Sequence, residues 1–242
     1  MNVVLNYVKD QFTQPNNGLK RLILFHILSF LLLFVFNTSC YICGYENFIH
    51  MVYQKLTLPS LYPLLLRSPW TILTHSFVHK RLLDLFWNVV MLYYLGNCIR
   101  AVTRFRHLWW LYGLGQFAGA LVFCLLHQFS PPFKGITAYF GGPSAAIYAL
   151  MVATCIFIPC IRVNLYLTKV PLKYFVLCLL ALAFLQLQSN QAGYCLAQLS
   201  GAVVGYLYAS KYRNEVNDNW RFFRSQGTMH ASSLRRMVKV RG

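Results

Sequence analysis

Long apolar stretches recur along the chain and determine its expected architecture. A helix of roughly 20 mostly apolar residues crosses a hydrocarbon core of about 30 Å. The chain has six runs of this kind, at residues 19–43, 82–99, 107–128, 142–160, 171–189 and 193–210. Because the apolar residues are continuous rather than alternating with polar ones, the pattern predicts helices and excludes a β-barrel. The expected fold class is an all-α integral membrane protein, a bundle of six transmembrane helices.

The expected organisation is a single domain with a flanking segment at each end. These are a cytoplasmic amphipathic arm, a six-span domain and a basic cytoplasmic tail, at residues 1–18, 19–211 and 212–242. Residues 44–81 are too apolar for a solvated linker, and three prolines (Pro59, Pro63 and Pro69) break them too often for a span. We expect these residues to form a loop half-embedded in the outer leaflet, with Trp70 at the interface.

The chain is strongly basic, with 22 Lys and Arg against 5 Asp and Glu and a net charge of +17. Alternate loops carry most of the cations. Of the 22 Lys and Arg, 17 fall on the side of the two termini. The other five fall on the opposite side of the membrane: Lys55, Arg67, Lys80, Arg81 and Lys134. The positive-inside rule therefore predicts that both termini are cytoplasmic. Topology, together with attraction of the basic tail to anionic lipid, accounts for the charge, so no nucleic-acid partner is expected.

The eight cysteines lie mostly inside the predicted spans. This placement is typical of small apolar packing residues rather than of a disulfide framework. Cys40 and Cys43 form a lone CxxC at the end of the first run, without a second pair that would complete a zinc site. We expect neither a metal nor another cofactor.

Polar side chains at membrane depth are candidates for function when they have partners. Asp84 and Asn88 lie in the first turns of the second run, Ser144 lies about one turn into the fourth, and Gln198 lies about five residues into the sixth. These three runs cross the membrane in the same direction, so the polar residues are predicted to lie at similar depths.

Small residues give the fourth and sixth runs a means of close approach. A small residue recurs every four positions on the sixth run, at Ala197, Gly201, Gly205 and Ala209. Others surround Ser144 on the fourth, at Gly141, Gly142, Ala145 and Ala146. Such stripes allow helices to pack closely in membranes. The stripe serves plain helix packing, and it is also what a site between the two helices would require.

Three stretches together resemble the rhomboid family of intramembrane serine proteases, in its compact six-span bacterial type. They read PWTILTHSFVHKRLLDLFWNVVMLYYLG, FGGPSAAIYAL and AQLSGAVVGYLYAS. The resemblance covers about residues 20–211 and implies a multi-pass protein of the bacterial inner membrane. It places Ser144 at the nucleophile position of a GxSx element. It also places Asn88 and Gly142 in the region that stabilises the oxyanion.

Two positions depart from the pattern of that family. Gln198 occupies the position of the catalytic histidine, and Asp84 that of the oxyanion histidine four residues before Asn88. An amide can hydrogen-bond to a serine but cannot take up its proton, and loss of the base costs about 10⁶ in kcat in a soluble serine protease. An ionised Asp84 would repel an oxyanion, whereas a buried, protonated Asp84 would donate to it. Whether the chain is an enzyme therefore stays uncertain.

Three hypotheses of function follow. The leading one is a rhomboid-family protein with an impaired or inactive peptidase site, a pseudoprotease that still engages transmembrane segments of client proteins. The alternative is an active serine endopeptidase that cleaves membrane proteins near the outer face and uses another base, with His75 and His79 on that side of the membrane. A small transporter or channel is the third, and the shortage of ionisable residues inside the spans speaks against it. Ser144 also has a simpler interpretation, as a small packing residue bonded to its own helix.

Overall fold

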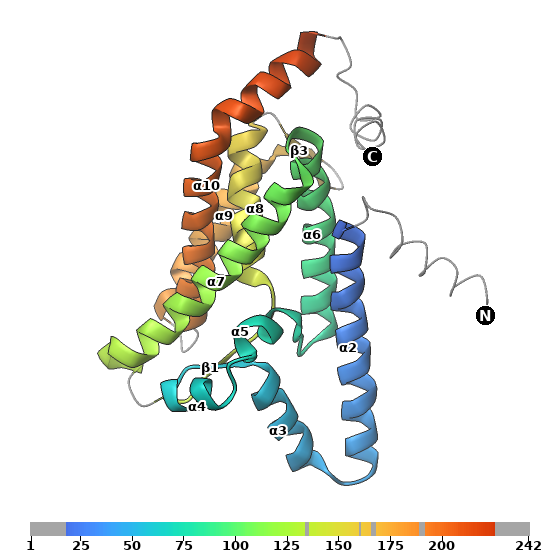
Figure 1. Cartoon of the computed structure of the whole chain (residues 1–242), viewed down its shortest axis with the longest axis vertical. Helices are drawn as coiled ribbons and strands as arrows, with labels where there is room; N and C mark the ends of the chain where they lie inside the picture. Colours follow the sequence, from blue (N-terminus) through green and yellow to red (C-terminus); the bar gives the residue numbers. More distant parts are fainter. Residues whose placement is uncertain (1–17, 134–135, 160, 166–167, 189–191, 226–242) are drawn as a thin grey trace, which may run out of the picture.

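The structure is a computed structural model, and it is mostly helical (Figure 1). It describes residues 18–133, 136–159, 161–165, 168–188 and 192–225. The predicted arm at residues 1–18 lies outside these ranges except for Gly18, and the predicted basic tail lies outside them beyond residue 225.

Three helices are long and apolar enough to cross a membrane, namely α2 (Gly18–Ile42), α6 (Leu82–Val102) and α7 (Phe105–Phe129). Two shorter apolar helices, α8 (Ser144–Phe157) and α9 (Leu172–Leu185), have 14 residues each. At 1.5 Å per residue each of them is about 21 Å long. The last helix, α10 (Ala192–Ser225), has 34 residues. Each predicted apolar run therefore overlaps one helix, and the fourth and fifth runs extend beyond theirs.

The fourth run is shorter as a helix than predicted, for local reasons. Helix α8 begins only after Pro143 and ends at Phe157, shortly before Pro159, because the residue before a proline avoids helical backbone angles. Two strands then form an antiparallel hairpin that the apolar pattern did not predict, β3 (Arg162–Leu165) and β4 (Thr168–Pro171).

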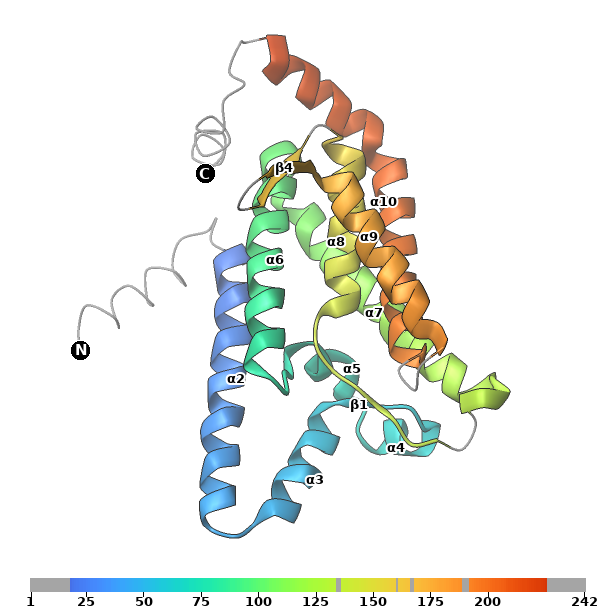
Figure 2. The same cartoon turned by 180° about the vertical axis from the view of Figure 1, so that it is seen from behind.

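Helix α10 continues past the predicted domain boundary at residue 211 and ends at Ser225. The first part of the predicted basic tail is therefore an extension of the last helix, which projects beyond the rest of the bundle (Figures 1 and 2).

The long segment between α2 and α6 contains only short helices. They are α3 (Glu46–Leu56), α4 (Tyr62–Arg67), α5 (Thr71–Thr74) and the 3-10 turn η1 (His75–Phe77). The longest of them has 11 residues, which is too short to cross a bilayer. They gather at the end of the molecule opposite to the end of α10 (Figures 1 and 2).

Glycines let α10 lie against α8. A Cβ atom at Gly201 would clash with the carbonyl group of Ala145, and one at Gly205 would lie 2.8 Å from the Cα of Ala149. A Cβ at Gly119 of α7 would lie 2.5 Å from the Cβ of Ala145 on α8 and 3.2 Å from the carbonyl oxygen of Ala197 on α10. Helices α7, α8 and α10 thus pack closely against one another. The predicted approach of the fourth and sixth helices is confirmed.

A short strand pair joins the segment between α2 and α6 to the chain just before Ser144. Strand β1 (Leu58–Pro59) pairs antiparallel with β2 (Tyr139–Phe140). The backbone N–H of Ser60 continues the pairing with a 2.9 Å hydrogen bond to the carbonyl of Ala138.

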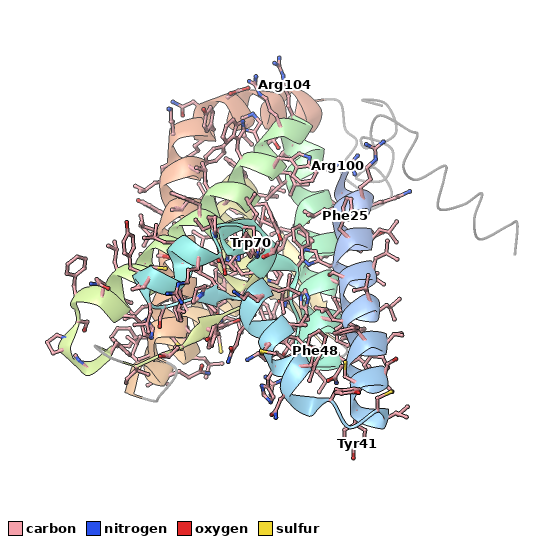
Figure 3. The ribbon with its side chains drawn as sticks, turned by 60° about the horizontal axis from the view of Figure 1, so that its bottom comes forward. Phe25, Tyr41, Phe48, Trp70, Arg100 and Arg104 are labelled. Carbon is pink, nitrogen blue, oxygen red and sulfur yellow. The ribbon has the colours of Figure 1, made fainter. Side chains whose placement is uncertain are left out.

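The two ends of the bundle differ in the side chains that they carry. Arg100 and Arg104 lie at the end where α6 finishes and α7 begins, and Tyr41 and Phe48 lie at the opposite end (Figure 3). Trp70 lies in the segment between α2 and α6, where its indole N–H donates a 2.9 Å hydrogen bond to the carbonyl of Lys55.

Candidate functional site

The loop of residues 141–143 connects β2 to α8 and presents Ser144. Gly142 has φ +96°, a left-handed conformation that favours glycine. Its backbone N–H donates a 2.7 Å hydrogen bond to the carbonyl of His75, which ties the loop to η1. Ser144 is the first residue of α8 and is half-buried. It therefore lies at the start of the helix and not one turn inside it, as the apolar pattern had suggested.

A buried polar network supports this loop from the side of α7. The Nδ1–H of His75 donates to the carbonyl of Thr71 at 2.8 Å, so the His75 Nε2 accepts from the Gln116 amide nitrogen at 2.7 Å. The second hydrogen of that nitrogen reaches the Gly142 carbonyl at 2.9 Å, and the Gln116 oxygen accepts from the Ala146 N–H at 3.4 Å. These partners leave one tautomer for His75 and one orientation for the Gln116 amide.

Burial lowers the pKa of His75 to about 4, although its backbone hydrogen bonds act in the opposite direction. The imidazole is therefore neutral at physiological pH. Both of its ring nitrogens are engaged, by Thr71 and Gln116, so neither is free to accept a proton from Ser144. His75 has a structural role in this geometry.

The hydroxyl of Ser144 forms its hydrogen bond with a phenol. Ser144 Oγ donates to the Tyr194 hydroxyl oxygen at 3.2 Å, and the Tyr194 O–H donates to the carbonyl of Gly141 at 2.9 Å. The Tyr194 ring packs tilted against Phe140, with 4.8 Å between the ring centroids. Tyr194 therefore bonds to both ends of the loop that carries Ser144.

Gln198 lies on α10 one turn after Tyr194 and is half-buried. Its amide makes no hydrogen bond to any residue that the structure describes, Ser144 included. The two helices that carry Ser144 and Gln198 do pack together, but the hydrogen bond expected between these side chains is not formed.

Asp84 forms a salt bridge with a neighbouring arginine, Arg81. Arg81 Nε donates to Asp84 Oδ2 at 2.9 Å, and its Nη2 donates to Oδ1 at 3.1 Å. The two side chains are 79% and 41% exposed, and the hydrogen bond to Asp84 raises the pKa of Arg81. Both oxygens of the Asp84 carboxylate are therefore engaged by Arg81. Asn88, one turn further along α6, is half-buried and has no hydrogen-bond partner among the described residues.

His79 was the other candidate for a replacement base. It is 2% exposed, and its Nδ1–H donates to the carbonyl of Phe77 at 3.2 Å. Burial lowers its pKa, while the charge of Asp84 acts in the opposite direction. Its Nε2 has no partner in the part of the chain that the structure describes. Ser144 is therefore not bonded to it.

Two residues of this site, Tyr194 and Gln116, were missed in the sequence. Tyr194 stands four residues before Gln198, a spacing that places both on one face of a helix. Gln116 is an amide inside the apolar run 107–128, and such a residue calls for a partner at membrane depth. Both features can be seen in the sequence, but neither identifies the group that the side chain contacts.

The groups around Ser144 differ in whether they can accept its proton. A serine attacks a carbonyl when a neighbouring group accepts its proton. The phenol beside Ser144 already carries a hydrogen, which it donates to Gly141, and the Gln198 amide takes up no proton at physiological pH. Within the described residues no group of three or more His, Cys, Asp or Glu is placed to hold a metal ion.

Comparison with known families agrees with the pattern of these residues. The model of the rhomboid domain matches residues 66–215, which is more than half of the chain. The matched range contains all five of the predicted site residues: Asp84, Asn88, Gly142, Ser144 and Gln198. A search of the curated proteins found no match.

Proposed function

Because the chain belongs to the rhomboid family, we propose that it is a member whose serine peptidase site is impaired or inactive and that it engages transmembrane segments of client proteins. The chain is a multi-pass integral membrane protein, as its apolar helices and its rhomboid domain indicate. The observation that carries the proposal is the hydrogen bond of the Ser144 hydroxyl to a phenol, at a site where the base position holds Gln198.

Client binding requires a route to the site rather than a proton acceptor. Helices α6 and α9 face each other through the rings of Trp87 and Phe175, whose centroids are 6.3 Å apart. Trp87 is 44% exposed, so this edge of the bundle is open to the surroundings. A client helix docked there would lie along α6, which carries Asp84 and Asn88.

The proposed topology has six spans, with both termini on the cytoplasmic side of the bacterial inner membrane. Arg100, Arg104 and the end of α10 share one end of the bundle (Figures 1 and 3), which supports a cytoplasmic placement of that end. We further propose that the basic tail binds anionic lipid.

Labelling with a fluorophosphonate tests the state of the site, since such probes react with activated serines. Purified protein in detergent is treated with the probe, and Ser144→Ala is the control. We expect no more labelling of the natural protein than of the variant. Strong labelling that Ser144→Ala abolishes would overturn the proposal of an inactive site.

Photo-crosslinking in membranes tests client binding. A photoreactive phenylalanine analogue replaces Trp87 in one variant and Leu32 in the control, since Leu32 is 69% exposed and belongs to α2, which is neither of the two helices of the α6–α9 edge. We expect discrete crosslinked membrane proteins from position 87 that position 32 does not give. Identical patterns from the two positions would argue against a client site at this edge.

The alternative function is an active endopeptidase that cleaves membrane proteins near the outer face. One observation favours it: Ser144 is present, half-buried and hydrogen-bonded at the first residue of α8. Cleavage of a model transmembrane substrate by the natural protein, lost in Ser144→Ala, would establish this alternative.

A further inference from the structure

Tyr194 contacts the loop that presents Ser144 at more than one point. Its hydroxyl oxygen accepts from Ser144 at 3.2 Å, and its proton is donated to Gly141 at 2.9 Å. A Cβ atom at Gly142 would lie 3.7 Å from the same oxygen. One phenol therefore bonds both to the first residue of the loop and to Ser144, the residue that follows the loop.

The ring of Tyr194 is held in place by an aromatic cluster. It packs against Phe140, which is fully buried and stacks on Phe123 with 5.3 Å between the centroids. Phe140 also lies 5.5 Å from the ring of His75. Because Phe140 belongs to β2 and Phe123 to α7, the position of the hydroxyl is determined by packing and not by the hydrogen bonds alone.

We propose that Tyr194 is a positioning residue that locks the site, because it holds the Ser144 hydroxyl hydrogen away from position 198 and joins Ser144 to Gly141. This inference rests on the proposed function and deepens it. Ser144 has one hydroxyl hydrogen, and a base at position 198 can receive it only after the bond to Tyr194 is broken. Restoring a histidine at position 198 is therefore insufficient as long as the phenol is present.

Three variants test the lock: Asp84→His with Gln198→His, the same pair with Tyr194→Phe, and the triple with Ser144→Ala as a control. Tyr194→Phe removes the hydroxyl and keeps the ring on Phe140. In the labelling reaction with a fluorophosphonate, Ser144 Oγ forms a bond to phosphorus, fluoride leaves, and the serine proton passes to the introduced imidazole. We expect the triple variant to be labelled at least about tenfold faster than the pair, the factor that corresponds to ~1.4 kcal/mol. Equal rates would overturn the lock.

A double-mutant cycle in the natural background gives a second measurement that needs no restored chemistry. It compares Ser144→Ala, Tyr194→Phe and their combination by the midpoint of thermal unfolding in detergent. We expect Tyr194→Phe to lower the midpoint by several degrees, and by clearly less when Ser144→Ala is already present. Strictly additive shifts would show that the two hydroxyls do not interact.

The two proposals fail in different ways. Ser144-dependent labelling of the natural protein would overturn the inactive site. Equal labelling of the double and triple variants, or additivity in the cycle, would overturn the lock alone.

Discussion

The loop at residues 141–143 has two sides that are built differently. On the side of α7, Gln116 and His75 are buried, and every hydrogen-bonding group of their side chains has a partner. On the side where a peptidase would do its chemistry, Gln198 has no hydrogen-bond partner among the described residues. Asp84 on that side forms an exposed salt bridge with Arg81.

The residues that position Ser144 therefore differ from the residues that would activate it. The network around Gln116 and the close packing of α8 fix where Ser144 lies, and neither uses the side chains of Asp84, Asn88 or Gln198. The position of Ser144 therefore does not depend on which residues stand at positions 84 and 198. Mutations on the supporting side should cost stability, whereas substitution of Gln198 on the other side should cost little.

The largest loss of stability is expected from Gly201→Ala, because Gly201 lets α10 pack closely against α8. The new methyl group would meet the backbone of Ala145, which cannot move aside as a flexible side chain would. Overpacking of this kind costs about 3 kcal/mol. Gly113→Ala is the matched control, because nothing lies within 4 Å of a Cβ at that position of α7. Equal midpoints of thermal unfolding for the two variants would show that Gly201 does not mediate the contact between α8 and α10.

Gln116→Leu is expected to have the next largest effect. Leucine has a similar size but leaves the His75 Nε2 and the Gly142 carbonyl without donors in a buried site. Buried unsatisfied groups of this kind cost roughly 2 kcal/mol in total. Asn97→Leu is the control, since that amide donates only to the Tyr93 carbonyl of its own helix. A loss for Gln116→Leu no greater than that for Asn97→Leu would mean that the network does not support the loop.

The sequence predicted the helices and the approach of α8 to α10 because apolar length and small residues act locally. It also selected Ser144, Gln198 and Asp84 as site residues, and their roles stay a prediction. It could not predict that Ser144 would bond to Tyr194, because that contact depends on how α10 is rotated against the loop. The β3–β4 hairpin was missed for a similar reason, since backbone pairing between two short segments leaves no apolar period.

Acid should destabilise the supporting side through His75. Its pKa is about 4 in the folded protein and near 6.5 when unfolded, so between these values only the unfolded chain binds the proton. Stability is therefore full above about pH 6.5 and falls as the pH approaches 4, by about 2 kcal/mol between pH 7 and pH 5.

The measurement is the unfolding midpoint as a function of pH, for the natural protein and for His75→Asn. The variant should be less stable at pH 7 but should show a shallower decline in acid, with a remaining slope from His79, whose pKa is also lowered by burial. Parallel curves for the two proteins would assign the acid sensitivity to other groups.

The smallest effect is expected on the other side of the loop, from Gln198→Leu. An amide without a hydrogen-bond partner at a half-buried position has no bond to lose, so the unfolding midpoint should change by no more than the equivalent of about 0.5 kcal/mol. Gln116→Leu makes the same chemical change at a position where the amide has three partners, and it is therefore the matched comparison. If Gln198→Leu were as costly as Gln116→Leu, position 198 would belong to a second supporting network. The glutamine would then be retained for structure, and the two sides of the loop would not differ in kind.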